Sequence, residues 1–341
     1  MIYRSTLLIL LTLLVAACTT PGTPGSSTSP GPEVRSVSMR LQWIPQWQFA
    51  GYIVALRKGY YADAGLEVTL NPGGPDLVPL PLVAAGSDDF GSTGADTVLL
   101  AREQGIAVVA LATWFQASPV AFMVHADSGI AGPQDFPGRR VAMFYGDNVE
   151  TEYLALLTAT GVDRSRITEI PGDYSITPFL ERRADVWPVY ATDQPHSARR
   201  AGAEVDLILA RDYGVKLMGD VLFTTEQFLR DNPRTVRAFV EATLRGWEDA
   251  VADPAAAIEL ILAYNPELDR DQLTFEAAET INLLRYGAGA TCLGLSDPVA
   301  WSEQAKLMHD LGLLSALPDS NAALRNEPIS AAHGAAGRQC P

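Results

Sequence analysis

Apolar and polar residues alternate over residues 37–43 and again over 66–70, and between these runs the apolar residues recur at helical spacing. Alternation predicts a half-buried strand, and a period near 3.6 residues predicts a helix with one buried face. Pro45 ends the first run, because a proline nitrogen cannot donate to a sheet. The segment 40–69 is therefore expected to form a strand, a loop, a helix and a second strand.

Strand-like and helix-like segments continue to alternate up to about residue 224, which predicts two α/β lobes. Further strands are expected at 106–112, 120–124, 140–144, 167–170, 186–191 and 218–224, with helices at 77–85, 96–104, 151–161 and 176–182. Beyond residue 225 the pattern is helical. Helices are expected there at 226–230, 233–252, 254–264, 271–286 and 298–311, and the Ala- and Gly-rich tail 318–341 is assigned no structure.

Two indoles and two amides follow the first expected strand: Trp43, Gln46, Trp47 and Gln48. In open α/β folds, ligands bind beyond the carboxyl ends of the strands. Indole faces stack on flat rings, and amides both donate and accept hydrogen bonds. This loop is therefore predicted to bind a flat heteroaromatic ligand. The alternative is that Trp43 and Phe49 belong to the core and that the glutamines are solvated.

Other aromatic and polar residues fall where they can complete such a site. The further aromatic candidates are Trp114, Tyr145, Tyr174, Trp187 and Tyr190, and the further polar candidates are Ser92, Thr93, Asn148 and Asp193. The aromatic rings are expected to sandwich the ligand as two lobes close, and the polar groups to bind its edge. Core packing is the alternative for each aromatic residue, and it is the expected role of Trp247 and Trp301.

The amino-terminal region has the pattern of a lipoprotein signal. Residues 1–17 carry one charge, Arg4, and then an apolar run that is too short to span a membrane. Small residues precede Cys18, as in the lipobox of bacterial lipoproteins, so cleavage before Cys18 and its acylation, including palmitate on the thiol, are expected. An ordinary secretory signal is the alternative. Residues 18–35, rich in Thr, Pro, Gly and Ser, are expected to be a disordered tether.

Charge and motif content limit the classes of function. The net charge of −15 argues against nucleic acid or an anionic membrane surface as a partner. The histidines at 125, 196, 309 and 333 are scattered, and no zinc, P-loop, nucleophile-elbow or intact dinucleotide motif is present, so neither a metal site nor catalysis is expected. Cys292 and Cys340 remain as a possible disulfide, although their spacing alone does not fix the geometry.

Several short motifs, taken in order, resemble one family. They lie at 43–52 (WIPQWQFAGY), 58–68 (KGYYADAGLEV), 71–75 (NPGGP), 88–91 (DDFG), 138–142 (GRRVA) and 228–239 (FLRDNPRTVRAF). The chain resembles the periplasmic-binding-protein receptors of ABC importers, in the branch that includes thiamine-precursor pyrimidine receptors and sulfonate receptors.

The resemblance implies a two-lobed α/β fold of type II, with the ligand in the cleft between the lobes. Lobe 1 is expected over 36–122 and 223–341 and lobe 2 over 123–222, joined by hinge strands near 121–124 and 221–224. It also implies a monomer that is lipid-anchored on the extracytoplasmic face of the cell membrane and serves a membrane permease. A receptor that signals through a membrane partner without transport is an open alternative.

Departures from the family pattern favour one ligand class. The pattern of the pyrimidine receptors and their fungal enzyme relatives has Asn and His at the positions where this chain has Gln46 and Phe49. The cysteine-rich signature of the fungal enzymes is also missing from this chain. A benzyl ring in place of an imidazole favours stacking on a larger planar ligand. Riboflavin is therefore the expected ligand, and no other cofactor is expected; the layout is similar to riboflavin-binding lipoproteins of this family. The alternatives are a hydroxymethylpyrimidine-type thiamine precursor and, less favoured, an alkyl sulfonate.

Overall fold

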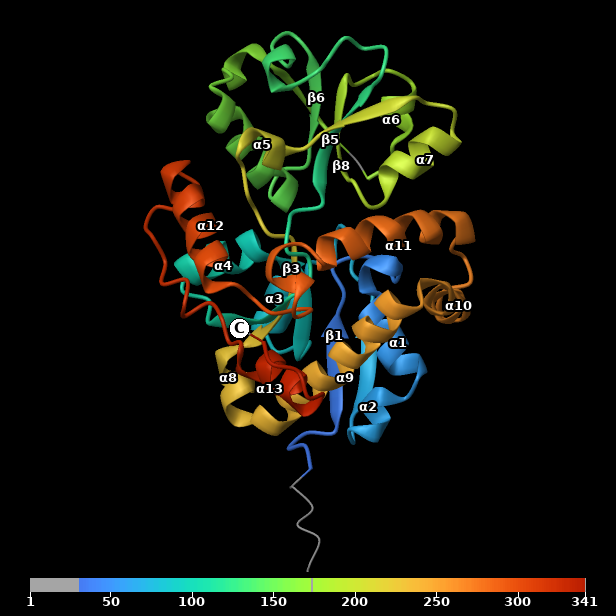
Figure 1. Ribbon diagram of the computed structural model, residues 1–341. Coiled ribbons are helices and arrows are strands. Elements are labelled where there is room, and N and C mark those ends of the chain that lie inside the picture. Colours follow the sequence, from blue (N-terminus) through green and yellow to red (C-terminus); the bar gives the residue numbers. More distant parts are fainter. Residues whose placement is uncertain (1–30, 173, 341) are drawn as a thin grey trace, which may run out of the picture. The chain divides into compact units, whose positions relative to one another are not determined.

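Two five-stranded sheets carry the fold of the computed structural model, which describes residues 31–172 and 174–340. The first sheet has the order β2-β1-β3-β10-β4, and β10 runs antiparallel to both of its neighbours. Figure 1 shows β1 and β3 of this sheet. Its strands are β1 (Ser36–Arg40), β2 (Glu67–Asn71), β3 (Phe90–Gly94), β4 (Val108–Thr113) and β10 (Asp220–Thr225).

The second sheet has the order β7-β6-β8-β5-β9, with β5 antiparallel to β8 and β9. Its strands are β5 (Val120–His125), β6 (Arg140–Met143), β7 (Thr168–Pro171), β8 (Val186–Tyr190) and β9 (Val205–Ile208). Only β9 has no counterpart among the predicted strands of this sheet. Its two inner residues, Asp206 and Leu207, are the exposed and half-buried ones, so its sequence shows little apolar signal.

The helices are distributed unequally between the sheets. Around the first sheet lie η1 (Trp47–Phe49), α1 (Ala50–Arg57), α2 (Tyr60–Asp63), α3 (Pro79–Ala84), α4 (Ala95–Glu103), α8 (Glu226–Asp231), α9 (Pro233–Ala252), α10 (Pro254–Tyr264), α11 (Arg270–Leu284), η5 (Gly287–Ala290), α12 (Pro298–Asp310) and α13 (Glu327–Ala335). With the second sheet belong η2 (Pro133–Asp135), α5 (Asn148–Thr160), η3 (Arg164–Arg166), α6 (Thr177–Leu180), α7 (Gln194–Arg200) and η4 (Ala210–Tyr213).

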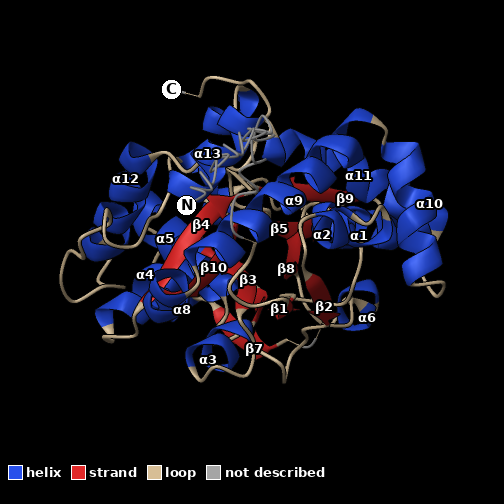
Figure 2. Cartoon of the chain, turned by 90° about the horizontal axis from the view of Figure 1, so that it is seen from below, coloured by secondary structure: helices blue, strands red, loops and turns tan. Residues whose placement is uncertain are grey.

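β4 shows why a continuous apolar run forms a central strand. All of its residues are buried, because successive side chains point to opposite faces and both faces are covered. Val109 and Leu111 pack in the cluster that contains α1 and α9, whereas Val108 and Ala110 pack in the cluster that contains α4 and α12. Figure 2 shows α9 and α13 on one side of the first sheet and α3 on the other.

The chain passes between the sheets twice, over residues 114–119 and 209–219. The predicted hinge strands at 121–124 and 221–224 lie within β5 and β10, so each crossing comes directly before its strand rather than in it. We call the first sheet with its helices lobe 1 and the second sheet with its helices lobe 2; η4 lies within the second crossing and packs on α5 of lobe 2.

The two crossings are hydrogen-bonded to each other. The Gly219 amide donates to the Phe115 carbonyl over 2.9 Å, and the Ser118 amide donates to the Leu217 carbonyl over 2.8 Å. A Cβ atom on Gly219 would lie only 2.9 Å from the Phe115 side chain, so glycine permits this close pairing. The connection between the lobes is therefore a paired double segment.

Helices α1 and α9 also approach closely through glycines. A Cβ atom on Gly246 of α9 would overlap the Gly51 carbonyl oxygen, and one on Gly51 would overlap the Trp247 ring. Trp247 is fully buried and stands near Trp114 and Tyr52, with ring centroids 5.6 and 6.4 Å away. This contact lies at the centre of the lobe 1 core.

The start of the described chain caps a helix. Glu33 accepts hydrogen bonds from the backbone amides of Arg234 and Thr235 in the first turn of α9, whose N-cap residue Asn232 makes no side-chain cap. A carboxylate there satisfies free amides and complements the helix dipole. Residues 31–35 of the predicted tether are thus attached to lobe 1. The predicted signal peptide 1–17, the acylation of Cys18 and tether residues 18–30 fall outside the described residues.

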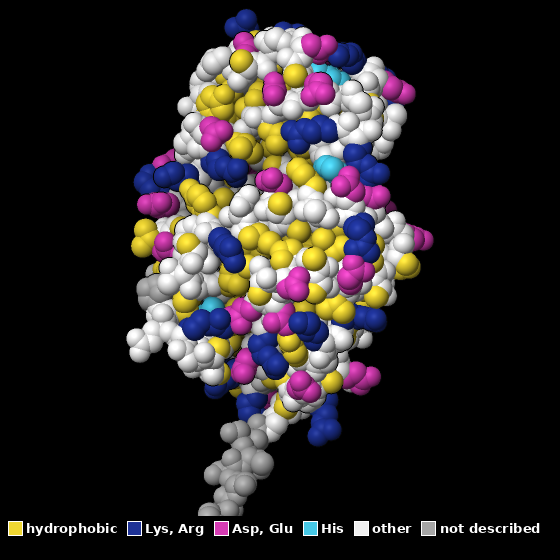
Figure 3. Space-filling view, turned by 45° about the vertical axis from the view of Figure 1, so that its right-hand side comes forward, with side chains coloured by type: hydrophobic (Ala, Val, Ile, Leu, Met, Phe, Trp, Pro, Cys, Tyr) yellow, Lys and Arg dark blue, Asp and Glu magenta, His cyan; other side chains and the backbone are white. Residues whose placement is uncertain are grey.

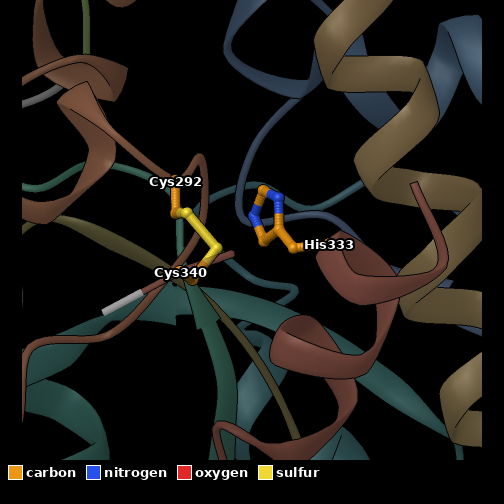
Figure 4. Close-up of side chains that lie close together, drawn as sticks. All are labelled: Cys292, His333 and Cys340. Atoms are coloured by element: carbon orange, nitrogen blue, oxygen red, sulfur yellow. A yellow bond between two sulfur atoms is a disulfide. The ribbon is translucent and has the colours of Figure 1, made fainter. Parts of the chain in front are cut away.

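The carboxyl-terminal segment contains a helix where the sequence was assigned none. Ile329 and Ala332 of α13 are buried in the cluster that contains α9, so tertiary packing rather than composition forms this helix. A disulfide joins Cys292 to Cys340, with Cα atoms 5.9 Å apart (Figure 4). The nearby His333 ring lies 2.9 Å from the Leu293 carbonyl oxygen. Because the two sulfurs are bonded to each other, this group offers no thiolate to a metal.

Within the described residues, every helix is too short or too polar to cross a membrane.

Candidate functional site

A cavity of about 260 Å³ is lined by residues of both lobes. Lobe 1 contributes Gln42 and Trp43, which follow β1, and lobe 2 contributes Phe144 and Tyr190, at the ends of β6 and β8. These strands therefore end at the cavity with their carboxyl termini, which is where ligands bind in open α/β folds.

One wall of the cavity is a row of aromatic rings. The centroid of Tyr174 lies 4.7 Å from that of Trp43 and 5.1 Å from that of Phe144, and Phe144 meets Trp187 edge-on at 6.1 Å. Trp43 belongs to lobe 1 and the other three to lobe 2, so the row crosses between the lobes. The Tyr174 side chain is 48% exposed, which leaves ring surface free for a ligand.

The loop that carries Trp43 is fixed by the loop after β2. The Gly73 amide donates to the Trp43 carbonyl over 3.0 Å, and the Leu41 amide donates to the Asn71 carbonyl over 2.9 Å. A Cβ atom on Gly73 would overlap the Leu41 carbonyl, so only glycine allows the two loops to approach this closely. The predicted turn cluster at 71–75 therefore positions the aromatic loop.

A second group of cavity residues is polar and centres on Tyr190. Its hydroxyl accepts a hydrogen bond from the Gln42 amide over 3.0 Å and another from the Asn148 amide over 2.9 Å. Nearby, the Gln48 amide donates to the Asp220 carboxyl over 2.6 Å. Gln42 is on lobe 1 while Tyr190 and Asn148 are on lobe 2, so this network also joins the lobes.

The cavity is acidic. Asp147 and Asp193 line it, and no Lys, Arg or His is among the described residues that do. Asp147 caps α5 and accepts a hydrogen bond from the Tyr174 hydroxyl over 3.2 Å. By contrast, Lys, Arg, Asp and Glu are interspersed on the outer face seen in Figure 3. The lack of basic side chains among the described wall residues is therefore specific to the cavity and is not shared by this outer face.

Most of the predicted site residues lie around this cavity: Trp43, Gln46, Gln48, Thr93, Tyr145, Asn148, Tyr174, Trp187, Tyr190 and Asp193. The cavity also includes Gln42 and Phe144, which the sequence interpretation had placed inside strands. Both directly follow the observed strands β1 and β6, and their position at a strand end was the available signal.

Three predicted site residues lie elsewhere. Trp47 is completely buried in the lobe 1 core, and its backbone amide donates to Glu276. Trp114 is buried against Tyr52, to whose hydroxyl its indole donates. Ser92 is adjacent in β3 to Thr93, which lines the cavity, and successive strand residues point to opposite faces. These residues support the site from within lobe 1 and are not part of its wall.

Three carboxyl groups near these polar residues, the half-buried Asp193 and the buried Asp220 and Glu276, protonate more readily than usual. Burial raises the pKa of Asp193 to about 6, and that of Asp220 to about 7 against the opposing effect of the Gln48 hydrogen bond. Burial, and then the charge of Asp193, raises the pKa of Glu276 to about 8. A group with a raised folded-state pKa holds its proton where the unfolded chain has lost it.

Stability should therefore fall as pH rises from about 5 to about 8, because the unfolded state binds fewer protons over that window. We expect Asp220→Asn to remove about 2 to 3 kcal/mol of this pH dependence of the unfolding free energy. Urea unfolding at several pH values measures it. Asp63→Asn, at an exposed position, is the matched control and should leave the slope unchanged. An equal slope in wild type and Asp220→Asn would contradict the assignment.

Comparison with known proteins places the chain in a family. The family model described as NMT1/THI5 like matches residues 46–257. The riboflavin-binding protein RibY of Chloroflexus aurantiacus is 32% identical over 94% of this chain and 96% of its own. The formylaminopyrimidine-binding protein of Halalkalibacterium halodurans is 24% identical over 81% of this chain and 83% of its own.

The fold has solved counterparts. The sulfonate-binding protein SsuA of Methylobacillus flagellatus KT superposes with a TM-score of 0.68 at 16% identity, over 89% of this chain and 95% of that one. This likeness confirms the predicted α/β periplasmic-binding-protein fold. Because the family model spans more than half of the sequence and RibY matches nearly all of it, the chain belongs to the NMT1/THI5-like family.

Proposed function

We propose that this protein binds riboflavin in the cavity between its lobes and delivers it to the membrane permease of an ABC importer. The observation that carries the proposal is the aromatic row that spans both lobes at the cavity wall. A fused three-ring ligand presents a large flat face to such a row, and each stacked aromatic pair contributes about 0.5 to 1.5 kcal/mol beyond area burial. The match to RibY supports the same ligand.

The alternatives fit the cavity less well. A sulfonate is an anion, and the described wall offers it Asp147 and Asp193 but no basic side chain. A thiamine-precursor pyrimidine is supported by the formylaminopyrimidine-binding relative, but that single small ring would cover only part of the row. A flavin contacts both groups of cavity residues, the aromatic row with its ring system and the polar residues around Tyr190 with its polar groups.

The delivery step rests on sequence as well as fold. The apolar run before Cys18 and the lipobox-like residues preceding it support export and acylation at Cys18, with residues 19–30 as a tether. We propose a monomeric receptor held by lipid at the extracytoplasmic face of the cell membrane, within reach of its permease. It releases its ligand chemically unchanged, so it acts as a receptor and not as an enzyme.

A fluorescence titration tests the ligand. Tryptophan emission should be quenched by riboflavin at submicromolar concentration, because Trp43 and Trp187 line the cavity. Hydroxymethylpyrimidine, thiamine and an alkyl sulfonate serve as competitors. The bound compound, extracted and analysed by mass spectrometry, should be intact riboflavin. Tight binding of the pyrimidine without any response to riboflavin would overturn the proposal, and conversion of the bound compound would show an enzyme.

A further inference from the structure

Three oxygen atoms on the polar side of the cavity lack hydrogen-bond partners within the described part of the chain. They are Gln42 Oε1, Asn148 Oδ1 and Asp220 Oδ1, and all three are buried. Gln42 and Asn148 line the cavity from opposite lobes, and Asp220 lies behind Gln48, which also lines it. Buried acceptors without partners are rare in folded proteins, because each has lost its hydrogen bonds to water.

A free amide oxygen remains however the two amides are oriented. Both Gln42 and Asn148 bond to the Tyr190 hydroxyl, which carries a single proton. That hydroxyl can donate to one amide oxygen at most, so at least one of the two amides must donate its NH₂ group and keep a free carbonyl oxygen. At least one amide oxygen at this wall therefore lacks a donor in any orientation of the two amides, and in the orientation observed both do.

A ligand satisfies these two amide oxygens if it brings hydrogen-bond donors, and the acidic wall favours one without negative charge. Hydroxyl groups on a flexible chain meet both requirements, since each one donates to an acceptor of its own. The aromatic row is a separate set of cavity residues, so the flat ring and the hydroxyl chain of one ligand would contact different residues.

We propose that the amide oxygens of Gln42 and Asn148 bind the polyhydroxyl chain of the ligand, and that the cavity thereby selects a neutral flavin carrying that chain over ring-only and phosphorylated forms. This inference rests on the proposed function. A phosphate ester at the end of the chain would bring two negative charges beside Asp147 and Asp193 with no basic residue among the described wall residues. Discrimination therefore comes from the polar wall, while the aromatic row supplies affinity for the ring.

Three flavins test the proposal on the wild-type protein. Riboflavin carries the ribityl chain, lumiflavin has the same ring with a methyl group in its place, and riboflavin 5′-phosphate adds the ester. Equilibrium titrations should give lumiflavin and the phosphate ester dissociation constants at least about tenfold above that of riboflavin. Lumiflavin binding as tightly as riboflavin would overturn the role of the chain, and the ester binding as tightly would overturn the selection by charge. In both cases the proposed function would stand, whereas binding of none of the three would remove both.

Two variants assign the effect to residues. Gln42→Met and Asn148→Leu replace the amides by apolar groups of similar size, and each should reduce the preference for riboflavin over lumiflavin to within about threefold. Gln134→Met, an exposed amide outside the cavity, is the matched control and should keep the full preference. An unchanged preference in both amide variants would overturn the assignment. A variant that fails to fold leaves the wild-type comparison of the three flavins intact as the deciding measurement.

Discussion

Replacing Tyr174 with alanine should raise the dissociation constant for riboflavin about 30- to 100-fold, a loss of about 2 to 3 kcal/mol. Its ring stands between Trp43 and Phe144, so its removal interrupts the aromatic row where the lobes meet. Tyr174→Phe keeps the ring and loses only the hydrogen bond to Asp147, and it should remain within about threefold of wild type.

A matched control tests whether the loss of any exposed tyrosine, and not of Tyr174 in particular, weakens riboflavin binding. Tyr286 is 53% exposed, close to the 48% of Tyr174, and does not line the cavity. Tyr286→Ala should bind riboflavin like the wild type in the same quenching titration. Equal losses in Tyr174→Ala and Tyr286→Ala would mean that the aromatic row is not the binding surface.

Gly246→Ala should destabilise the protein by about 3 kcal/mol, the largest effect on stability that we expect from adding one methyl group. The new Cβ would overlap the Gly51 carbonyl oxygen, and because that atom is backbone, no change of rotamer relieves the clash. Helices α1 and α9 would have to separate at the centre of the core. Urea unfolding followed by circular dichroism measures the loss.

Gly334→Ala is the matched control, because Gly334 also lies inside a helix but its added Cβ would meet nothing within 4 Å. Alanine favours helix over glycine, so this variant should be as stable as wild type or more stable by up to about 1 kcal/mol. If the two variants lost equal stability, the close approach of α1 and α9 would not be the cause.

Most strands of the fold were predictable because buried strands consist mainly of apolar residues, which can be read directly from the sequence. β4 and β5 are buried throughout and apolar except at their last residues, Thr113 and His125, as expected for strands covered on both faces. The helix α13 shows no such pattern. Its segment is rich in Ala and Gly, and it is held by packing on α9 and by the bond from Cys292 to Cys340. Such long-range contacts cannot be derived from a local pattern.

The sequence predicts which kinds of side chain form the site, but not which individual residues line the cavity. Trp43 and Trp47 lie four residues apart in one loop, yet Trp43 lines the cavity and Trp47 is buried in the core. The difference arises because η1 begins at Trp47 and directs that ring into the core. No residue pattern in the loop predicts where η1 begins. Phe144 was missed for the opposite reason, since its apolar character fitted a strand interior while β6 ends one residue earlier.

The position of β10 between β3 and β4 governs the order in which the protein matures. Both neighbours precede lobe 2 in the chain, whereas β10 follows it. Until residues 220–225 have been synthesised, β3 and β4 each present an unpaired edge that is open to wrong partners. Lobe 2 is continuous in sequence and can form its sheet during that interval. A chain of this design is thus exposed to aggregation chiefly through its first half, before the later segment is available to pair with it.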